Sequence, residues 1–231
     1  MKEIEISKAA KRAHRGEQTR QEILETAVNI ASAEGLEGLT IGRLAQELAM
    51  SKSGLFAHFG SKEELQIATI ETARDIFVRE IVDPLSEIEK GIARLQAMIE
   101  KWLSYVERRI FKGGCFFAAA AAEFDSRPGA IRDLIVKLSK SWLHMIEGEA
   151  RQAQQVDQID NQLDATQLAF ELHALAHGAN WAYQLFGDKR AFVRAREAIN
   201  NRLRESATPA GLRLLQSDTG KAKKVAAKRT K

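Results

Sequence analysis

The sequence has a single cysteine, three prolines and two tyrosines among its 231 residues, and it has no long apolar run. One cysteine excludes an internal disulfide and a zinc site built from several cysteines. Because no segment has the apolar length of a membrane span or the layout of a secretion signal, we expect a cytoplasmic protein. Apolar residues recur with the helical period almost throughout, and no strand-like alternation persists, so the sequence predicts an all-α fold.

Charge is unevenly distributed along the chain. The formal net charge is +4, yet residues 63–220 hold 20 Lys or Arg against 23 Asp or Glu, while residues 221–231 hold six Lys or Arg and no acidic residue. The final segment also lacks the apolar residues that packing requires, so we expect a disordered basic tail over residues 211–231. The mildly acidic middle of the chain is not expected to be a second nucleic-acid surface.

Residues 40–62 have the pattern of two short helices joined by a tight turn. Thr40 and Ser51 are each placed to accept a hydrogen bond from the first turn of the helix that follows. The turn itself falls at residues 49–51. Apolar residues recur at helical spacing in both segments: Ile41, Leu44, Ala45, Leu48, Leu55 and Phe59. The pattern predicts a helix-turn-helix, whose second helix has a length and a polar face that suit the major groove of DNA.

Further helical patterns flank the helix-turn-helix. Residues 19–34 predict a helix upstream, and Ser61 with Glu64 has the spacing of a capping box, so another helix begins at once downstream. The first twenty residues are rich in Lys and Arg and poor in apolar residues. We therefore expect residues 1–17 to form a flexible basic arm, which either contacts DNA or only aids solubility.

The string TIGRLAQELAMSKSGLFAHFGSK, with the helix before it, resembles the DNA-binding domain of the TetR family of transcriptional regulators over about residues 18–68. The chain departs from that pattern at Phe56, where a tyrosine that can contact phosphate is common, at Gly42 in a helix interior, and at Met50 in the turn. Carried over position by position, the resemblance implies DNA contacts from these residues: Thr40, Arg43, Ser51, Lys52, Ser53, Gly54, Phe56, His58 and Lys62.

A larger domain is expected over residues 69–210. Asp83-Pro84 ends the helix that starts near Glu63, because proline disfavours helical geometry in the residue before it. The remaining helices are expected at residues 85–111, 115–124, 125–155, 163–186 and 189–206. The resemblance implies a three-helix DNA-binding domain followed by a six-helix domain for effector binding and dimerisation.

A small-molecule effector of unknown identity is implied by the resemblance. Side chains that could surround its cavity between helices are Trp102, Phe116, Phe117, Trp142, Met145, Phe170, His173, His177 and Trp181. Ordinary core packing is the alternative for each of them. No carboxylate completes a metal motif around the two histidines, so neither a metal nor a cofactor is expected. We expect Cys115 to be a buried, inert thiol rather than a redox sensor.

The last two helices are expected to pair with those of a second copy. Their apolar stripes consist of Leu168, Leu172, Leu175, Ala179 and Ala182, and of Phe192, Ala195, Ile199 and Leu203. A twofold dimer reads inverted half-sites, so the expected function is a homodimeric repressor on a palindromic operator, released by its effector through the helix from Glu63. One alternative is a sequence-tolerant, nucleoid-type DNA-binding protein that uses the basic tail. Another is a helical enzyme, for which no nucleophile and base pair or phosphate loop is present.

Overall fold

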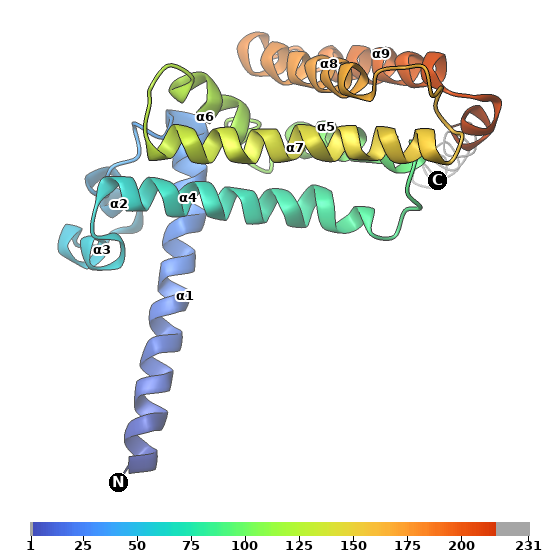
Figure 1. The fold of residues 1–231 in the computed structure, drawn as a ribbon. Helices are drawn as coiled ribbons and strands as arrows, with labels where there is room; N and C mark the ends of the chain where they lie inside the picture. Colours follow the sequence, from blue (N-terminus) through green and yellow to red (C-terminus); the bar gives the residue numbers. More distant parts are fainter. Residues whose placement is uncertain (1, 216–231) are drawn as a thin grey trace, which may run out of the picture. The chain divides into compact units, whose positions relative to one another are not determined.

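The computed structural model describes residues 2–215, with side chains from residue 16 onward, and its regular secondary structure is helical in that range (Figure 1). The α-helices are α1 (Lys2–Glu34), α2 (Ile41–Leu48), α3 (Lys52–Phe59), α4 (Lys62–Phe77), α5 (Ile92–Glu107), α6 (Phe116–Phe124), α7 (Ala130–Gln155), α8 (Ala165–Phe186) and α9 (Arg190–Ser206). The prediction of an all-α fold is confirmed. None of these helices is long and apolar enough to cross a membrane.

The N-terminal residues differ from the sequence-based expectation, and most of the predicted C-terminal tail lies outside the described residues. Residues 2–17 were expected to form a flexible arm, but they are the first half of α1. Alanine, lysine, glutamate and arginine dominate this stretch, and they are strong helix formers that extend the helix backwards. The predicted tail falls largely on residues 216–231, which lie outside the described residues, and its residues 211–215 are helical.

The chain forms two compact units. The head unit consists of the residues up to Ile76 together with Phe111–Val136, and the body unit consists of Phe77–Ile110 together with the residues from Lys137 onward. The sequence placed residues 111–136 with the larger domain, whereas they pack with the N-terminal helices. Gly113 permits this packing, because a Cβ there would lie 1.6 Å from the carbonyl oxygen of Ser32.

The core of the head unit forms between α1, α2 and α3. Leu44 and Leu55 are fully buried, and Phe59 is 4% exposed, as the helical spacing predicts. Ile41 and Leu48, which were also expected to be buried, are only half-buried. Arg20 on α1 covers the buried end of α3, since its guanidinium carbon lies 5.3 Å from the centre of the Phe59 ring.

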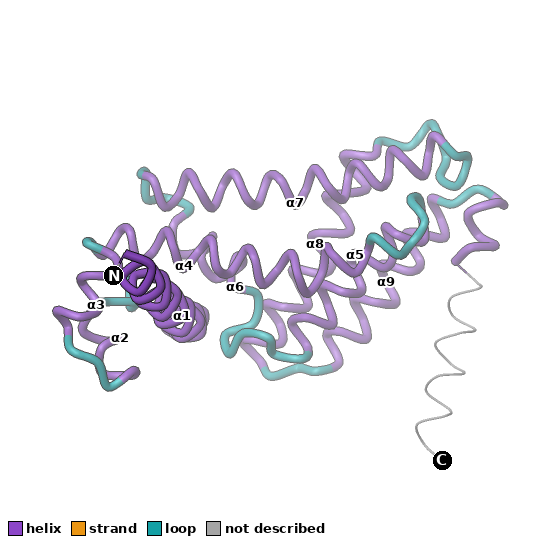
Figure 2. The backbone as a smooth tube through the Cα atoms, turned by 90° about the horizontal axis from the view of Figure 1, so that it is seen from below, coloured by secondary structure: helices purple, strands orange, loops and turns teal. Residues whose placement is uncertain are grey.

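In the body unit, α5 packs on α8 and α9 (Figure 2). A π-helical turn (Val78–Val82) and a 3₁₀ turn (Asp83–Leu85) follow α4, so the regular α-helix ends at Phe77, before the break predicted at Asp83-Pro84. Asp83 keeps helical dihedrals (φ −55°, ψ −43°), so the restriction that proline places on the preceding residue does not end this helix. The sequence placed the start of α5 at residue 85, but the helix begins only at Ile92. The φ of Gly91 is +124°, which is not a helical value, so the helix cannot include this residue.

α8 and α9 lie side by side (Figure 1). The stripes that were expected to meet a second copy instead hold the body unit together. Leu168 and Leu172 of α8 and Phe192 and Leu203 of α9 are all 0% exposed. A different set of large apolar side chains on these two helices is exposed: Phe170, Trp181, Leu185, Phe186 and Val193.

Candidate functional site

The helix-turn-helix contains a sharp turn between α2 and α3. α2 ends at Leu48, and Ala49 adopts the left-handed conformation with φ 51° and ψ 35°. The amide of Met50 then donates to the carbonyl of Ala45 at 3.0 Å. A left-handed alanine costs about 1 kcal/mol relative to glycine, and the packing of both helices against α1 offsets this cost. The turn predicted at residues 49–51 is confirmed.

Side-chain caps fix where both helices begin. The Thr40 hydroxyl accepts from the amide of Arg43 at 3.0 Å, and the Ser51 hydroxyl accepts from the amide of Gly54 at 3.1 Å. Both predicted caps are confirmed. Because each cap satisfies one amide of the first turn, α3 starts directly after the turn, with the earliest amides at its N-terminus left for an outside acceptor such as a phosphate oxygen.

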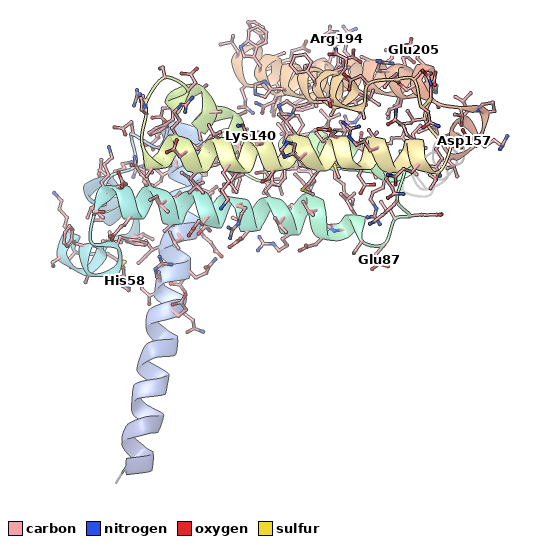
Figure 3. The ribbon with its side chains drawn as sticks, viewed as in Figure 1. His58, Glu87, Lys140, Asp157, Arg194 and Glu205 are labelled. Carbon is pink, nitrogen blue, oxygen red and sulfur yellow. The ribbon has the colours of Figure 1, made fainter. Side chains whose placement is uncertain are left out.

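The outer face of α3 is small and contains little charge. Lys52, Ser53, Phe56 and Ala57 are exposed, and the Phe56 side chain is 54% exposed. The sequence interpretation missed Ala57, although its position four residues after Ser53 places it on the same side of the helix. His58 is half-buried and its ring centre lies 6.2 Å from that of Phe59 (Figure 3).

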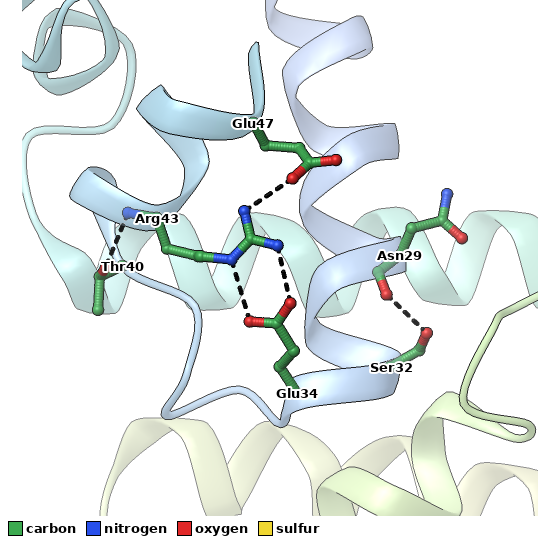
Figure 4. A network of polar contacts seen from close by, with 6 residues as sticks. All are labelled: Asn29, Ser32, Glu34, Thr40, Arg43 and Glu47. Atoms are coloured by element: carbon green, nitrogen blue, oxygen red, sulfur yellow. Dashed lines mark hydrogen bonds and ion pairs between the residues drawn. The ribbon is translucent and has the colours of Figure 1, made fainter. Parts of the chain in front are cut away.

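Arg43 is already paired with carboxylates of its own chain (Figure 4). Its guanidinium lies 2.8 Å from a Glu34 oxygen and 2.7 Å from a Glu47 oxygen. The hydrogen bond from Arg43 holds the pKa of the Glu34 carboxyl below its ordinary value, and both carboxylates raise the pKa of Arg43. A DNA phosphate would have to displace these partners, so in this structure Arg43 links α1 to α2.

Lys62, at the start of α4, is paired in the same way. Its Nζ donates to the backbone oxygen of Glu37 at 3.1 Å and to the Glu37 carboxylate at 3.0 Å. The hydrogen bond from Lys62 lowers the pKa of that carboxyl. Lys62 therefore ties α4 to the link between α1 and α2.

The α1–α2 link is also held by α6. The Glu123 carboxylate accepts from the amide of Leu36 at 2.7 Å and from the amide of Glu37 at 2.9 Å. On the other side of the link, the Gln66 side chain donates to the carbonyl of Leu36 at 2.7 Å. No sequence pattern indicates this role of Glu123, which is 87 positions from Leu36. The helix-turn-helix is thus anchored by α4 and by a segment from much later in the chain.

Part of the predicted effector site forms an aromatic cluster in the body unit. The Trp102 and His173 ring centres are 6.0 Å apart, and those of Phe77 and Trp142 are 5.0 Å apart. Trp142 Nε1 and His173 Nδ1 are buried and have no hydrogen-bond partner among the described residues. Burial, with a smaller contribution from His177, lowers the pKa of His173 to about 4, so this ring is neutral near pH 7.

Of the other residues predicted for the pocket, His177 lies beside the cluster, with its ring centre 5.7 Å from that of His173, and the rest lie elsewhere. Phe116 and Phe117 belong to the head unit, where the Phe116 ring also lies 5.9 Å from that of Phe111. Phe170 and Trp181 are 63% and 55% exposed on α8, His177 is exposed, and Met145 is half-buried. Helical periodicity alone does not show which face of α8 is covered, so these residues could not be separated from the sequence.

An open groove of about 630 Å³ lies between α8 and α9. Phe170, Leu175 and Gly178 line one side of it, and Ala198 and Arg202 line the other. Arg202 is held in place by the carboxylate of Glu171. The groove is part of the exposed apolar face of these helices, and it is separate from the buried Trp142 and His173 nitrogens.

These features define a helix-turn-helix protein in which a short second helix presents an exposed face. Residues 23–69 match the family described as "Bacterial regulatory proteins, tetR family", and residues 91–199 match "Tetracyclin repressor-like, C-terminal domain". Together the two matches cover well over half of the chain. The chain belongs to the TetR family, and it is a transcriptional regulator with a helix-turn-helix DNA-binding domain and a ligand-binding C-terminal domain.

Three individual proteins that are similar to this chain have sequence identities of 26%, 21% and 24%. A nucleoid occlusion factor SlmA from Idiomarina loihiensis is 26% identical over 141 residues, which is 59% of this chain and 70% of that protein. A TetR transcriptional regulator from Chloroflexus aurantiacus has the same fold, with a TM-score of 0.78 and 21% identity over 84% of this chain and 98% of that one. The structure of AibR with isovaleryl coenzyme A and operator DNA has a TM-score of 0.63 and 24% identity, covering 78% and 95%.

Proposed function

We propose that the chain is a homodimeric repressor that binds a palindromic operator in double-stranded DNA and is released by a small-molecule effector. The observation that carries the proposal is the outer face of α3, which is exposed at Lys52, Ser53 and Phe56 directly after a capped, tight turn. An α-helix presented in this way fits the major groove, where side chains reach base edges and first-turn amides hold phosphates.

We assign DNA contacts to the exposed part of α3, and not to cations that already pair with a carboxylate of the chain. Lys52, Ser53, Phe56 and His58 contact the groove or its phosphates, and the first turn of α3, from Ser51 to Gly54, binds a phosphate oxygen. Thr40 caps the helix that crosses the backbone. Arg43 and Lys62 position the helix-turn-helix through their carboxylate partners, and they reach DNA only if those partners are exchanged.

Dimerisation is supported by the exposed apolar face of α8. Phe170, Trp181 and Leu185 lie 11 and then 4 positions apart, so they share one side of the helix, and Trp181 and Leu185 are 55% and 61% exposed. Apolar patches of this kind mark association sites. A second copy related by a twofold axis would cover the face with the same residues and pair two α3 helices for inverted half-sites.

Effector binding is supported by the unpartnered nitrogens in the body unit. A buried N–H without an acceptor costs about 1–3 kcal/mol, so the Trp142 indole N–H favours a ligand with a hydrogen-bond acceptor next to aromatic or aliphatic groups, while the neutral His173 ring can donate or accept at Nδ1 according to its tautomer. If this ligand prefers the form of the protein that does not fit the operator, it weakens DNA binding by that preference, and DNA weakens effector binding equally.

Selection of bound duplexes from a random pool tests the proposal directly. Full-length protein should enrich an inverted repeat and bind it at least about a thousandfold more tightly than random duplex at physiological salt. A Lys52→Glu variant should lose the site, whereas Lys140→Glu, on α7, should keep it. Equal affinity for all duplexes would contradict a role as a site-specific repressor.

A second candidate function is broad DNA binding of the nucleoid type. It is favoured by the nucleoid occlusion factors among the relatives and by the six basic residues at positions 221–231. Each phosphate neutralised adds about 0.9 to the slope of log affinity against log salt, so deletion of residues 221–231 should reduce that slope by up to about 5. An unchanged slope would rule out a contribution from the tail.

A further inference from the structure

The exposed face of α3 has an aromatic ring near its centre. At 3.6 residues per turn, Lys52, Phe56, Ser53 and Ala57 follow one another around the helix within an arc of about 140°. Phe56 therefore lies between the lysine and the serine, and Ala57 borders the serine on its far side. With 54% of its surface exposed, Phe56 is covered on its inner side only.

The chemistry of these two side chains limits what they can recognise. Neither the phenylalanine ring nor the alanine methyl can donate or accept a conventional hydrogen bond, and Phe56 has no hydroxyl with which to hold a phosphate. In the major groove the base edges of unmodified DNA carry donors and acceptors, apart from one apolar group, the C5 methyl of thymine. An aromatic ring placed on that floor gains most where it covers such a methyl.

We infer that Phe56 is a specificity-determining residue that selects thymine through its C5 methyl group in each operator half-site. The inference rests on the proposed function, in which α3 enters the major groove. The charged and polar neighbours Lys52 and Ser53 then read or hold the adjacent positions, while the ring excludes water from the thymine methyl.

The test replaces thymine by deoxyuridine in the selected operator, because this change removes the methyl and leaves every base-pairing group in place. At the contacted position, full-length protein should bind the uracil duplex about fourfold more weakly for one half-site and about 15-fold more weakly for both. A further duplex carries a C·G pair in place of the T·A pair at this position and should bind more weakly. Replacing that cytosine by 5-methylcytosine restores a C5 methyl group and should recover part of the lost affinity.

Two variants assign the methyl effect to the ring. Phe56→Ala should bind the thymine and uracil duplexes equally, whereas Phe56→Leu, which keeps an apolar side chain, should retain most of the difference. Lys52→Ala is the matched control, and it should weaken both duplexes by the same factor. Thermal unfolding of each variant should match the parent, because the side chain is largely exposed.

The outcomes separate the inference from the proposed function. If the pool yields no preferred site, the proposed function fails. If a site is found but uracil is tolerated at every thymine, the inference is overturned and the repressor proposal stands. If Phe56→Ala keeps the full uracil penalty, another residue reads the methyl and the assignment to Phe56 is wrong.

Discussion

Single side chains in this protein take their roles from their partners rather than from their type. Arg43 and Lys62 are cations in a DNA-binding motif, yet each is bound by carboxylates within its own chain. His173 is a titratable residue, yet its burial keeps it neutral near pH 7. Phe56, by contrast, is an apolar residue without cover on its outer side. Its exposure singles it out as a contact residue more clearly than charge singles out the two cations.

His173 predicts a pH dependence of stability. Burial lowers its folded-state pKa from 6.5 to about 4, so the unfolded chain binds a proton in this interval and the folded chain does not. Stability from this residue is therefore complete above about pH 6.5 and falls by about 3 kcal/mol as the pH drops to 4. The free energy of unfolding, measured with urea at several pH values, should fall less between pH 6.5 and 4 in His173→Gln than in the parent.

The control for that measurement is His144→Gln, because His144 is an exposed histidine on α7. This variant should lose stability between pH 6.5 and 4 as the parent does, because it keeps His173. A His173→Gln protein with the same loss of stability between pH 6.5 and 4 as the parent would refute the effect of burial.

At the scale of helices and links, the helix-turn-helix depends on contacts that reach far along the chain. α2 and α3 are eight residues each, which is too short for stable helices on their own, so caps and packing must hold them. The link before α2 is bound by Lys62 and Gln66 from α4 and by Glu123 from α6. The later segment around α6 is thus a structural part of the head unit.

Glu123 gives the sharpest test of that arrangement. Glu123→Ala removes both hydrogen bonds to the Leu36 and Glu37 amides, and should lower the free energy of unfolding by about 2–3 kcal/mol. Amide hydrogen exchange should accelerate at Leu36 and Glu37. Asp125→Asn, one residue beyond α6 and exposed, is the control and should leave both amides protected. Unchanged exchange in Glu123→Ala would show that the carboxylate does not hold the link.

At the scale of the whole molecule, the proposed dimer depends on the exposed side of α8. The apolar residues that helical spacing assigned to the dimer interface pack α8 against α5 and α9 instead. A second set of apolar residues remains exposed. Trp181 and Phe186 belong to this set, with ring centres 5.0 Å apart. Charged side chains such as Arg194 and Glu205 lie on the neighbouring α9 (Figure 3).

A charge on the α8 face should separate the proposed dimer. Trp181→Glu places a carboxylate in the centre of the face, and sedimentation should change from twice the 25.7 kDa chain mass to the single chain mass. Operator affinity should then fall by at least about a hundredfold, because the two half-sites are no longer bound together. Val156→Glu, which charges an exposed apolar site outside α8, is the matched control. A Trp181→Glu protein that stays dimeric would place the interface elsewhere.

Local sequence patterns were enough to predict the all-α fold and the helix-turn-helix. The caps at Thr40 and Ser51 act within three residues, and the buried positions of α3 follow from one period, so local physics was sufficient. It was insufficient for α8, where apolar residues lie on both sides of the helix and periodicity does not choose between them. The packing of the whole chain buries Leu172 and leaves Trp181 exposed. It also brings Glu123 to Leu36, 87 positions away, because such partners depend on which faces of the helices pack together.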